Sequence, residues 1–265
     1  MMEHLKDLNV VITAAASGIG VEIAKILMKN GSNVIVCDKD EVALKRLNNE
    51  CPGLLSMNID VSNEEDVLRF FDEVASKFGS IDALINNAGI AGPSSELVNV
   101  EMKDWEDTIR VNLTGTFLCS RSAIPLLQKS DGGSIINIGS TSSFMGTPLR
   151  SAYTASKWGL IGLTKTWAME YGKDKIRVNT ICPTSVSGER IDGVIKRDAE
   201  YRNTTPEKIK EEYLNQTSLK TFIDSEEIAG MVVYLLSPLA KNISGQMMVI
   251  DGNTETLSMP EIKKE

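Results

Sequence analysis

Residues 10–20 read VVITAAASGIG. An apolar run of strand length is followed by small residues and two glycines, and an amphipathic helical pattern begins near residue 18. Small residues in a strand–helix turn let the backbone approach a diphosphate closely. The start of the helix adds free N–H groups and the positive end of its dipole. We therefore expect the turn at Ser17, Gly18 and Ile19 to bind the diphosphate of a dinucleotide. The turn alone leaves one alternative open, because tight strand–helix turns also use glycine for packing.

A carboxylate stands where a dinucleotide site requires one. Asp38 ends the next apolar run, 18 residues after Gly20, where an acidic side chain accepts hydrogen bonds from the adenosine ribose. The alternative role for Asp38 is a turn or helix cap, but the two features together favour dinucleotide binding. A carboxylate repels a 2′-phosphate, and no Arg or Lys lies between Thr13 and Gly20 to attract one. We expect NAD rather than NADP as the cofactor, although Lys39 weakens this preference.

Outward from this turn, short apolar runs alternate with amphipathic helical stretches along the chain. Strands are expected at residues 10–13, 33–38, 54–60, 83–86, 134–140, 176–182 and 247–251, and helices near 18–30, 40–50, 64–78, 101–128, 151–171 and 225–236. Such alternation predicts a parallel sheet with helices on both faces. The sequence is therefore expected to form one α/β domain over residues 1–265, with a doubly wound, Rossmann-type sheet of seven strands.

Residues 187–222 interrupt the alternation and are called the lid segment below. They contain no expected strand, are dense in charge, and suggest two short helices at about 189–201 and 206–215. Thr205 is the expected N-cap of the second helix, with Pro206 in its first turn. An insertion after the carboxyl end of a strand lies where open α/β sheets bind ligands. We expect a lid over the substrate, the alternative being a solvated surface excursion.

Composition excludes several classes of function. The chain has 265 residues, 42% of them hydrophobic, and a net charge of −8. Such a chain has no basic field to bind nucleic acid or an anionic membrane. No apolar run is long enough to span a bilayer, and the polar start does not resemble a signal peptide. We expect a cytoplasmic protein whose partner is a small molecule.

Histidine and cysteine usage narrows the chemistry. His4 is the single histidine, which excludes Ser-His-Asp and Cys-His catalysis and zinc sites built on several histidines. The four cysteines show no close CxxC spacing, so no metal site is expected and buried thiols are the preferred interpretation. Acid–base chemistry at neutral pH must therefore come from a Tyr, Lys, Asp, Glu or Cys with a shifted pKa.

Four further motifs, in this order, resemble the short-chain dehydrogenase/reductase family over nearly the whole chain. They are Asn86-Asn87-Ala88-Gly89, Asn112, Ser140 and Tyr153-Thr154-Ala155-Ser156-Lys157. The Tyr-x-x-x-Lys spacing alone is weak evidence, because Tyr171 and Lys175 share it. The phosphate-type turn and the serine 13 residues before Tyr153 make the resemblance specific.

The resemblance implies a catalytic role for four side chains. Tyr153 would remove the alcohol proton, or donate it in the ketone direction. Lys157, one helical turn away, would lower the pKa of that phenol. Ser140 would hold the substrate oxygen, and Asn112 would fix a water that relays protons through Lys157. In isolation Ser140 would be an ordinary strand-end hydroxyl and Asn112 a polar residue inside a helix.

The resemblance also assigns cofactor contacts. Asp60 and Val61 would contact the adenine, Asn87 would support the cofactor and the sheet, and Val186 and Ser187 would contact the carboxamide and a phosphate. Tyr153 and Lys157 would contact the cofactor as well.

Two positions depart from the family pattern. Ala14 replaces the first glycine of the turn, and a left-handed backbone there would cost about 1–2 kcal/mol. Thr184 replaces a glycine after Pro183, which puts the path of that loop in doubt.

The helix expected at 151–171 is apolar around nearly its whole circumference. Its large apolar residues are Trp158, Leu160, Ile161, Leu163, Trp167, Ala168 and Met169. A helix that is apolar on every side is buried on every side. We therefore expect a homo-oligomer, a tetramer as is common in the family.

The favoured function is an NAD-dependent oxidoreductase that transfers hydride between a secondary alcohol or its ketone and the nicotinamide. Two alternatives stay open: a catalytically silent nucleotide-sensing or scaffold protein, and a non-redox epimerase or dehydratase. The substrate is left open. Arg150 and Arg190 are candidate anchors for an anionic group, although solvated surface charges are the favoured interpretation of both.

Overall fold

The computed structural model describes residues 2–257 and has a seven-stranded parallel sheet at its centre. The strands are β1 (Asn9–Thr13), β2 (Asn33–Asp38), β3 (Leu55–Asn58), β4 (Ala83–Asn86), β5 (Gly133–Ile138), β6 (Ile176–Pro183) and β7 (Met247–Ile250). Their order is β3-β2-β1-β4-β5-β6-β7, and every pairing is parallel. The chain thus winds outward in both directions from β1 and β4, as expected for a doubly wound Rossmann-type fold.

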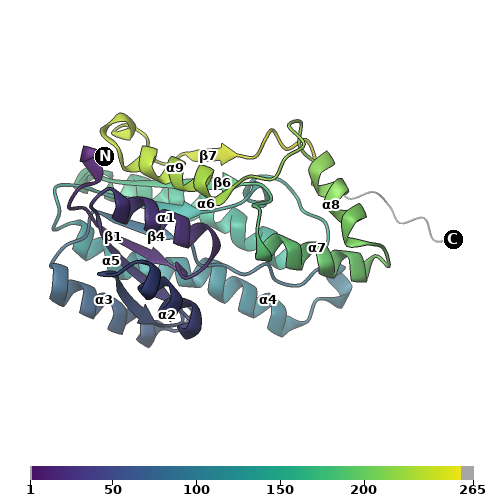
Figure 1. Ribbon diagram of the computed structural model, residues 1–265, viewed down its shortest axis with the longest axis horizontal. Coiled ribbons are helices and arrows are strands. Elements are labelled where there is room, and N and C mark those ends of the chain that lie inside the picture. The colour runs from purple at the N-terminus through teal and green to yellow at the C-terminus, as the bar shows by residue number, and fades with distance from the viewer. Residues whose placement is uncertain (1, 258–265) are drawn as a thin grey trace.

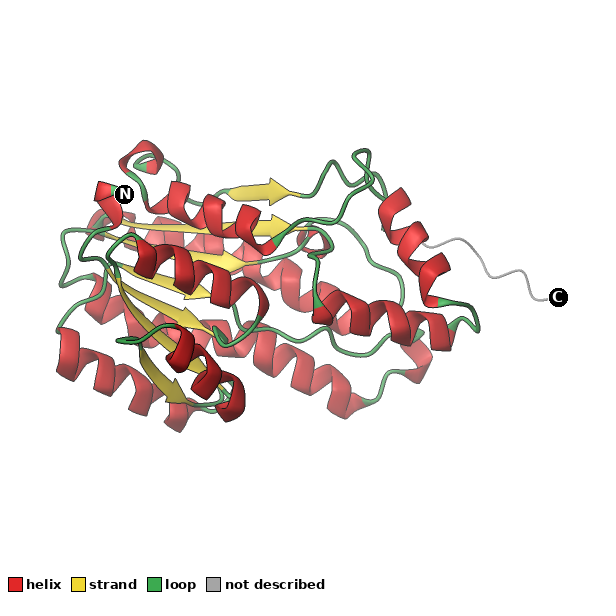
Figure 2. Cartoon of the chain, in the orientation of Figure 1, coloured by secondary structure: helices red, strands yellow, loops and turns green. Residues whose placement is uncertain are grey.

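Helices cover both faces of the sheet (Figures 1 and 2). The long helices are α1 (Gly18–Lys29), α2 (Glu41–Glu50), α3 (Glu64–Phe78), α4 (Met102–Ile109), α5 (Gly115–Leu127), α6 (Ser151–Tyr171), α7 (Glu189–Tyr201), α8 (Pro206–Asn215) and α9 (Ser225–Leu236). The short turns are η1 (Glu3–Leu5), η2 (Leu97–Asn99), η3 (Arg110–Thr114), η4 (Thr141–Ser143), η5 (Gly172–Asp174) and η6 (Pro238–Ala240).

Two hydrophobic cores follow from the alternation of side chains along the strands. In β1, Val10 and Ile12 pack into the core beneath α1 and α9, while Val11 between them packs into the core beneath α3, α5 and α6. Successive residues of a strand point to opposite faces. A strand covered on both faces is therefore apolar at every position, as these runs are.

The largest differences from the sequence expectation lie at β3, at the end of β5 and in the stretch 101–128. β3 is shorter than residues 54–60, and β5 ends at Ile138, since the following residues enter the turn η4. The stretch expected as one helix at 101–128 consists of α4, the π-helical turn η3 and α5, with Pro125 inside the last of these. A single π turn adds about one residue to an otherwise helical period, so the apolar pattern hardly changes.

The lid segment forms the two helices that the sequence predicts, with matching bounds. Thr205 caps α8, its hydroxyl accepting a hydrogen bond from Lys208 N at 3.4 Å. Figure 1 shows α7 and α8 beyond the carboxyl ends of the strands, where the sheet opens. The two helices share a small apolar core that includes Ile191, Ile195 and Ile209. Within the described residues, no helix has both the length and the apolar character needed to cross a bilayer.

Candidate active site

The turn after β1 combines strained backbone with close packing. Ala14 has φ 49° and Gly18 has φ 54°, so both lie in the left-handed region. The strain anticipated at Ala14 is therefore present, at a cost of about 1–2 kcal/mol. A Cβ added at Gly20 would lie 2.6 Å from Ala15 Cα and 2.7 Å from Ala14 O. Gly20 is thus required for the helix to approach the strand.

The first turn of α1 keeps its N–H groups free of side-chain caps. Ser17 is the N-cap residue, and its hydroxyl makes no capping hydrogen bond. An added Cβ at Gly18 would meet nothing within 4 Å. Open space in front of uncapped N–H groups at a helix start is the environment that a diphosphate needs. The residues present therefore fit the diphosphate of a dinucleotide.

Asn87 and Asp38 fix this turn from two sides. Asn87 Nδ2 donates to Thr13 O at 3.1 Å and to Ala14 O at 2.8 Å. Asp38 Oδ2 accepts from Ala16 N at 3.0 Å, and its Oδ1 accepts from Asp40 N at 3.0 Å. The turn-capping role that was the alternative for Asp38 is therefore real. It also holds the carboxylate beside the turn at the end of β2.

Asp60 and Val61 lie at the same edge of the sheet, after β3. Asp60 Oδ1 accepts from Ser62 N at 2.8 Å and from Ser62 Oγ at 2.7 Å. Val61 is buried against Gly115, where an added Cβ would lie 3.0 Å from Val61 Cγ2. Both residues thus have local structural contacts in addition to their place near the expected adenine.

The π-helical turn η3 orients Asn112 toward the centre of the site. Asn112 Oδ1 accepts from Ile90 N at 2.7 Å, and its Nδ2 donates to Ile90 O at 3.0 Å and to Ser156 Oγ at 3.0 Å. A Cβ added at Gly89 would lie 3.3 Å from Asn112 Oδ1 and 3.5 Å from Lys157 Nζ. Asn112 and Lys157 therefore flank the same glycine.

Tyr153 and Lys157 lie one turn apart on α6. Lys157 Nζ is 5.6 Å from the centroid of the Tyr153 ring and donates to Ile138 O at 2.8 Å. The lysine is only 4% exposed. Burial lowers its pKa against the opposing effect of Tyr153. The carbonyl at the end of β5 thus holds the ammonium beside the phenol.

The surroundings of Tyr153 favour its phenolate. Burial by itself raises the pKa of Tyr153, but the charges of Lys157 and Arg190, a hydrogen bond with Ser140 and the charge of Arg150 together hold it below the usual value of 10. Ser140 is the N-cap of η4, and its Oγ accepts from Ser142 N at 3.2 Å. A phenol with a lowered pKa is a better base at neutral pH.

The loop after β6 follows a regular path despite Thr184. Thr184 N donates to Ile250 O at 3.2 Å, and its φ is not positive, so glycine is not required at this position. Ser187 N donates to Ile223 O at 2.9 Å, and Val186 forms a bridge with Ile223. Backbone contacts with Ile223, which directly follows the lid segment, therefore fix Val186 and Ser187.

Arg150 differs from the favoured sequence interpretation. It is buried rather than solvated, 7% exposed, and its Nη2 pairs with Asp198 Oδ1 on α7 at 3.2 Å. Arg150 is thus engaged by a carboxylate of the protein. Arg190, in contrast, is exposed in the first turn of α7, and no carboxylate of the described residues forms an ion pair with it.

Asp198 is a residue that the sequence interpretation missed. Its carboxylate accepts from Ser94 Oγ at 2.6 Å and from Tyr213 Oη at 2.7 Å, in addition to Arg150. These partners come from the loop after β4, from α8 and from the start of α6. A sequence feature that could have identified Asp198 is the helical spacing of Ile191 and Ile195. Asp198 continues that spacing and therefore lies on the inward-facing side of the helix.

Two relatives with known names are oxidoreductases, and one family profile matches most of the chain. The profile of a family described as enoyl-(acyl carrier protein) reductase matches residues 13–253. The 3-oxoacyl-(acyl-carrier-protein) reductase of Thermotoga maritima is 34% identical over 245 residues, covering 91% of this chain and 95% of the relative. The D-beta-hydroxybutyrate dehydrogenase of Rhizobium meliloti is 35% identical over 251 residues, covering 91% and 96%.

Solved structures give the same result at the level of the fold. An NAD⁺-bound xylitol dehydrogenase superposes with a TM-score of 0.89 at 26% identity, covering 94% of this chain and 99% of that one. The aldohexose dehydrogenase of Thermoplasma acidophilum superposes with a TM-score of 0.86 at 30% identity, covering 98% and 99%. The likeness therefore extends over nearly the whole of each protein.

Proposed function

The chain belongs to the short-chain dehydrogenase/reductase family, and from that premise we propose that it is an NAD-dependent oxidoreductase acting on a secondary alcohol and its ketone. The observation that carries this proposal is Tyr153, whose pKa is held below its usual value beside Lys157 and Ser140. A nicotinamide cofactor, when bound, accepts or supplies the hydride. The remaining chemistry is proton transfer at the alcohol or ketone oxygen, and the phenol of Tyr153 can carry it out.

The four side chains divide the work between them. Tyr153 Oη removes the proton from the alcohol, or returns it to the ketone oxygen in the reverse direction. The Ser140 hydroxyl donates a hydrogen bond to the same substrate oxygen. Lys157 stabilises the phenolate by its charge. Asn112, beside Lys157 across Gly89, positions a water that passes protons from the lysine to solvent.

Asp38 supports NAD over NADP. Its carboxylate is held at the turn by Ala16 N, and a 2′-phosphate on the adenosine would face this negative charge. Lys39 is exposed, and Asp40 follows it directly. The xylitol dehydrogenase that this chain resembles was solved with NAD⁺. Asp60 and Val61 would complete the adenine site, and Val186 and Ser187 would contact the nicotinamide end.

The lid segment and Arg190 support a small polar substrate. α7 and α8 lie over the opening of the sheet (Figure 1), and Arg190 presents a guanidinium without an ion-pair partner among the described residues. One relative is named for a hydroxy acid, D-beta-hydroxybutyrate. A hydroxy acid would offer both the secondary alcohol for Tyr153 and a carboxylate for Arg190, because guanidinium pairs strongly with carboxylate.

The proposal includes the organisation of the protein. One domain over residues 1–265 would carry both the cofactor and the substrate, and the molecule would work as a cytoplasmic homotetramer. The support for the tetramer is the outer stripe of α6, where Trp158 is 50% and Met169 84% exposed. Large apolar side chains exposed in this way on one helix are typical of a subunit interface.

The test is absorbance at 340 nm, with secondary alcohols and hydroxy acids assayed against NAD and NADP in parallel. We expect turnover with NAD that Tyr153→Phe abolishes. Tyr171→Phe is the matched control, because Tyr171 lies on the same helix with the same spacing to a lysine and should retain activity. Turnover with NADP alone would contradict the role of Asp38.

Two other outcomes correspond to the alternative functions. NADH binding without turnover of any substrate would favour a nucleotide-sensing or scaffold protein. Conversion of substrate without net formation of NADH would favour an epimerase or dehydratase. Either result would contradict the proposed reaction while leaving the cofactor site in place.

A further inference from the structure

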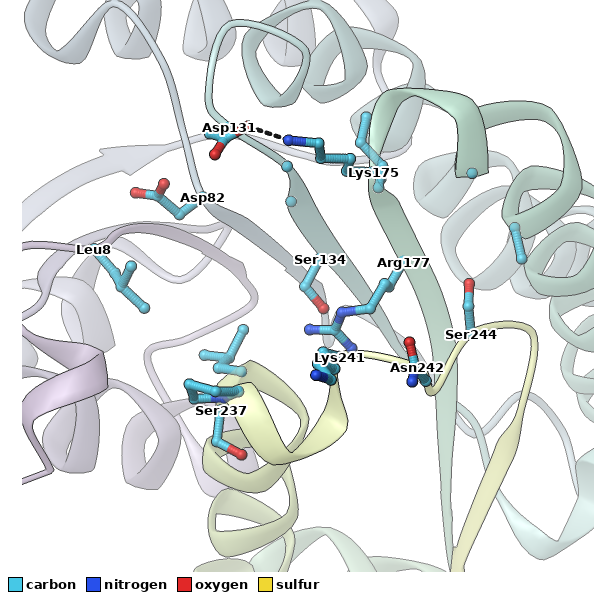
Figure 3. Close-up of a pocket in the computed structure, with 17 residues that line it drawn as sticks. Leu8, Asp82, Asp131, Ser134, Lys175, Arg177, Ser237, Lys241, Asn242 and Ser244 are labelled. Atoms are coloured by element: carbon cyan, nitrogen blue, oxygen red, sulfur yellow. Dashed lines mark hydrogen bonds and ion pairs between the residues drawn. The ribbon is translucent and has the colours of Figure 1, made fainter.

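A cavity lies at the opposite end of the sheet from Tyr153. Its volume is about 600 Å³, within the usual range for small-ligand sites, and it opens where β5 and β6 begin (Figure 3). Ser134, Arg177 and Lys241 line it, together with the apolar side chains of Leu8 and Pro238. The candidate active site uses none of these residues.

Arg177 brings an uncompensated charge into this cavity. Its guanidinium donates to Ile243 O at 3.2 Å and to Leu235 O, so carbonyl oxygens fix its orientation. No carboxylate of residues 2–257 forms an ion pair with it. Burial lowers the pKa of Arg177. A partly buried cation that meets only carbonyl dipoles is an attractive partner for an anion.

The two acidic residues that line the cavity are already engaged. Asp131 forms an ion pair with Lys175, with 2.5 Å between Asp131 Oδ1 and Lys175 Nζ. The carboxylate of Asp82 accepts from Asn9 N at 2.8 Å and from Ser130 Oγ at 2.7 Å. Asp131 is therefore paired with a cation, whereas Asp82 keeps its negative charge; neither carboxylate forms an ion pair with Arg177 within residues 2–257.

Ser134 supplies a second group without a partner. It pairs in register with Arg177 across β5 and β6, so both side chains project from the same face of the sheet. Ser134 is 2% exposed, and its Oγ makes no hydrogen bond within the described structure. Figure 3 shows this hydroxyl directed toward the Arg177 guanidinium. Buried hydroxyls without a partner are rare, because their desolvation is uncompensated.

Lys241 extends the positive field to the rim of the cavity. It is exposed directly after η6 and forms no ion pair among the described residues.

We propose that this cavity binds a small organic oxyanion, a carboxylate or a phosphate. Arg177 and Ser134 would hold its oxygens, Lys241 would add charge, and Leu8 and Pro238 would contact a short apolar portion.

The experiment is a thermal-unfolding titration of the full chain with inorganic phosphate or with butyrate. Ligands that bind only the folded state raise Tm in a saturable manner. Sodium chloride at matched ionic strength and neutral butyramide are the blanks. We expect saturable stabilisation by at least one of the two anions, and the preferred anion distinguishes a phosphate ligand from a carboxylate.

Variants locate the binding. Lys241→Ala and Ser134→Ala should each weaken the apparent affinity at least threefold, and Arg177→Lys, which keeps the charge but loses the planar fork, at least tenfold. Lys103→Ala on α4 is the matched control for loss of one exposed lysine and should leave the affinity unchanged. Lys241→Ala keeps the carbonyl contacts of Arg177, so it provides a folded test if Arg177→Lys is unstable.

Two results would overturn the proposal. The first is stabilisation no greater than that by sodium chloride. The second is equal affinity in wild type, Lys241→Ala and Ser134→Ala, which would place the anion elsewhere, such as at the start of α1.

Discussion

At the scale of single residues, the site depends on cations placed around one phenol. Lys157 and Ser140 were predictable, because their types and spacing follow from the motif around Tyr153. The influence of Arg190 on the pKa of Tyr153 was not, since it requires the folded position of α7. The ion pair of Arg150 could not be predicted from the sequence either. Its partner Asp198 lies 48 residues away, and no local pattern links the two.

Arg190→Met should shift the pH dependence of alcohol oxidation upward. In the proposed reaction alcohol oxidation requires the phenolate of Tyr153, so the rate should rise with pH through the pKa of that group. The charge of Arg190 lowers this pKa, and its removal therefore raises the pKa and reduces the rate at neutral pH. The check is the profile of kcat/KM against pH, with Arg197→Met, exposed on the same helix, as control. An unshifted profile would contradict the electrostatic role of Arg190.

The same variant separates charge from substrate anchoring. If Arg190 also binds a carboxylate, the KM of the Arg190→Met variant for a hydroxy acid should rise about tenfold or more, as expected for loss of a charge-assisted contact. The KM for a neutral secondary alcohol should stay nearly constant.

At the scale of elements, the lid segment is held by a buried polar network rather than by its apolar core alone. The bounds of α7 and α8 were predictable from the helical period and from Thr205 with Pro206. Their position beyond the carboxyl ends of the strands was not predictable, because it depends on Asp198 meeting Ser94, Arg150 and Tyr213 from three other segments. The π-helical turn η3 was missed for a related reason, since one extra residue leaves no mark in an apolar pattern.

Asp198→Asn should loosen the lid segment without unfolding the sheet. The change leaves the buried guanidinium of Arg150 without its carboxylate, and breaking a buried pair from one side costs about 3–5 kcal/mol. Hydrogen exchange should accelerate in α7 and α8, while β1, β4 and β5 keep their protection. Asp192→Asn, exposed on the same helix, is the control. Uniform acceleration across the sheet would show that the network supports the whole fold instead.

At the scale of the whole molecule, the sequence predicts the seven strands and their cover of helices because both signals are periodic. Strand order and the register of each pair come from packing over long distances in the chain. The far cavity at Arg177 is a consequence of that packing. Ser134 and Arg177 are separated by 43 positions and become neighbours only through the pairing of β5 with β6.

The outer stripe of α6 leads to a prediction about assembly. The sequence suggested a helix buried on all sides, whereas this chain by itself buries one side, including Leu160 and Trp167. Trp158 and Met169 lie exposed on the other side, with Gly162 between them open to space. Lys165 lies on the same side between Gly162 and Met169, and its Nζ donates to Gly245 O at 3.2 Å. Two large apolar side chains exposed on one face still favour contact with another protein surface, and a second copy of the chain would provide one.

Met169→Glu should therefore dissociate the expected tetramer. A carboxylate placed in an apolar interface must lose its hydration without gaining a partner, so the mutant should sediment as a smaller species at concentrations where the wild type stays assembled. Val42→Glu on α2 is the matched control, because Val42 is also well exposed, at 70%, and lies on a different helix. Sedimentation velocity measures both. A wild type that sediments as a monomer, or a mutant as large as the wild type, would show that the α6 stripe faces solvent.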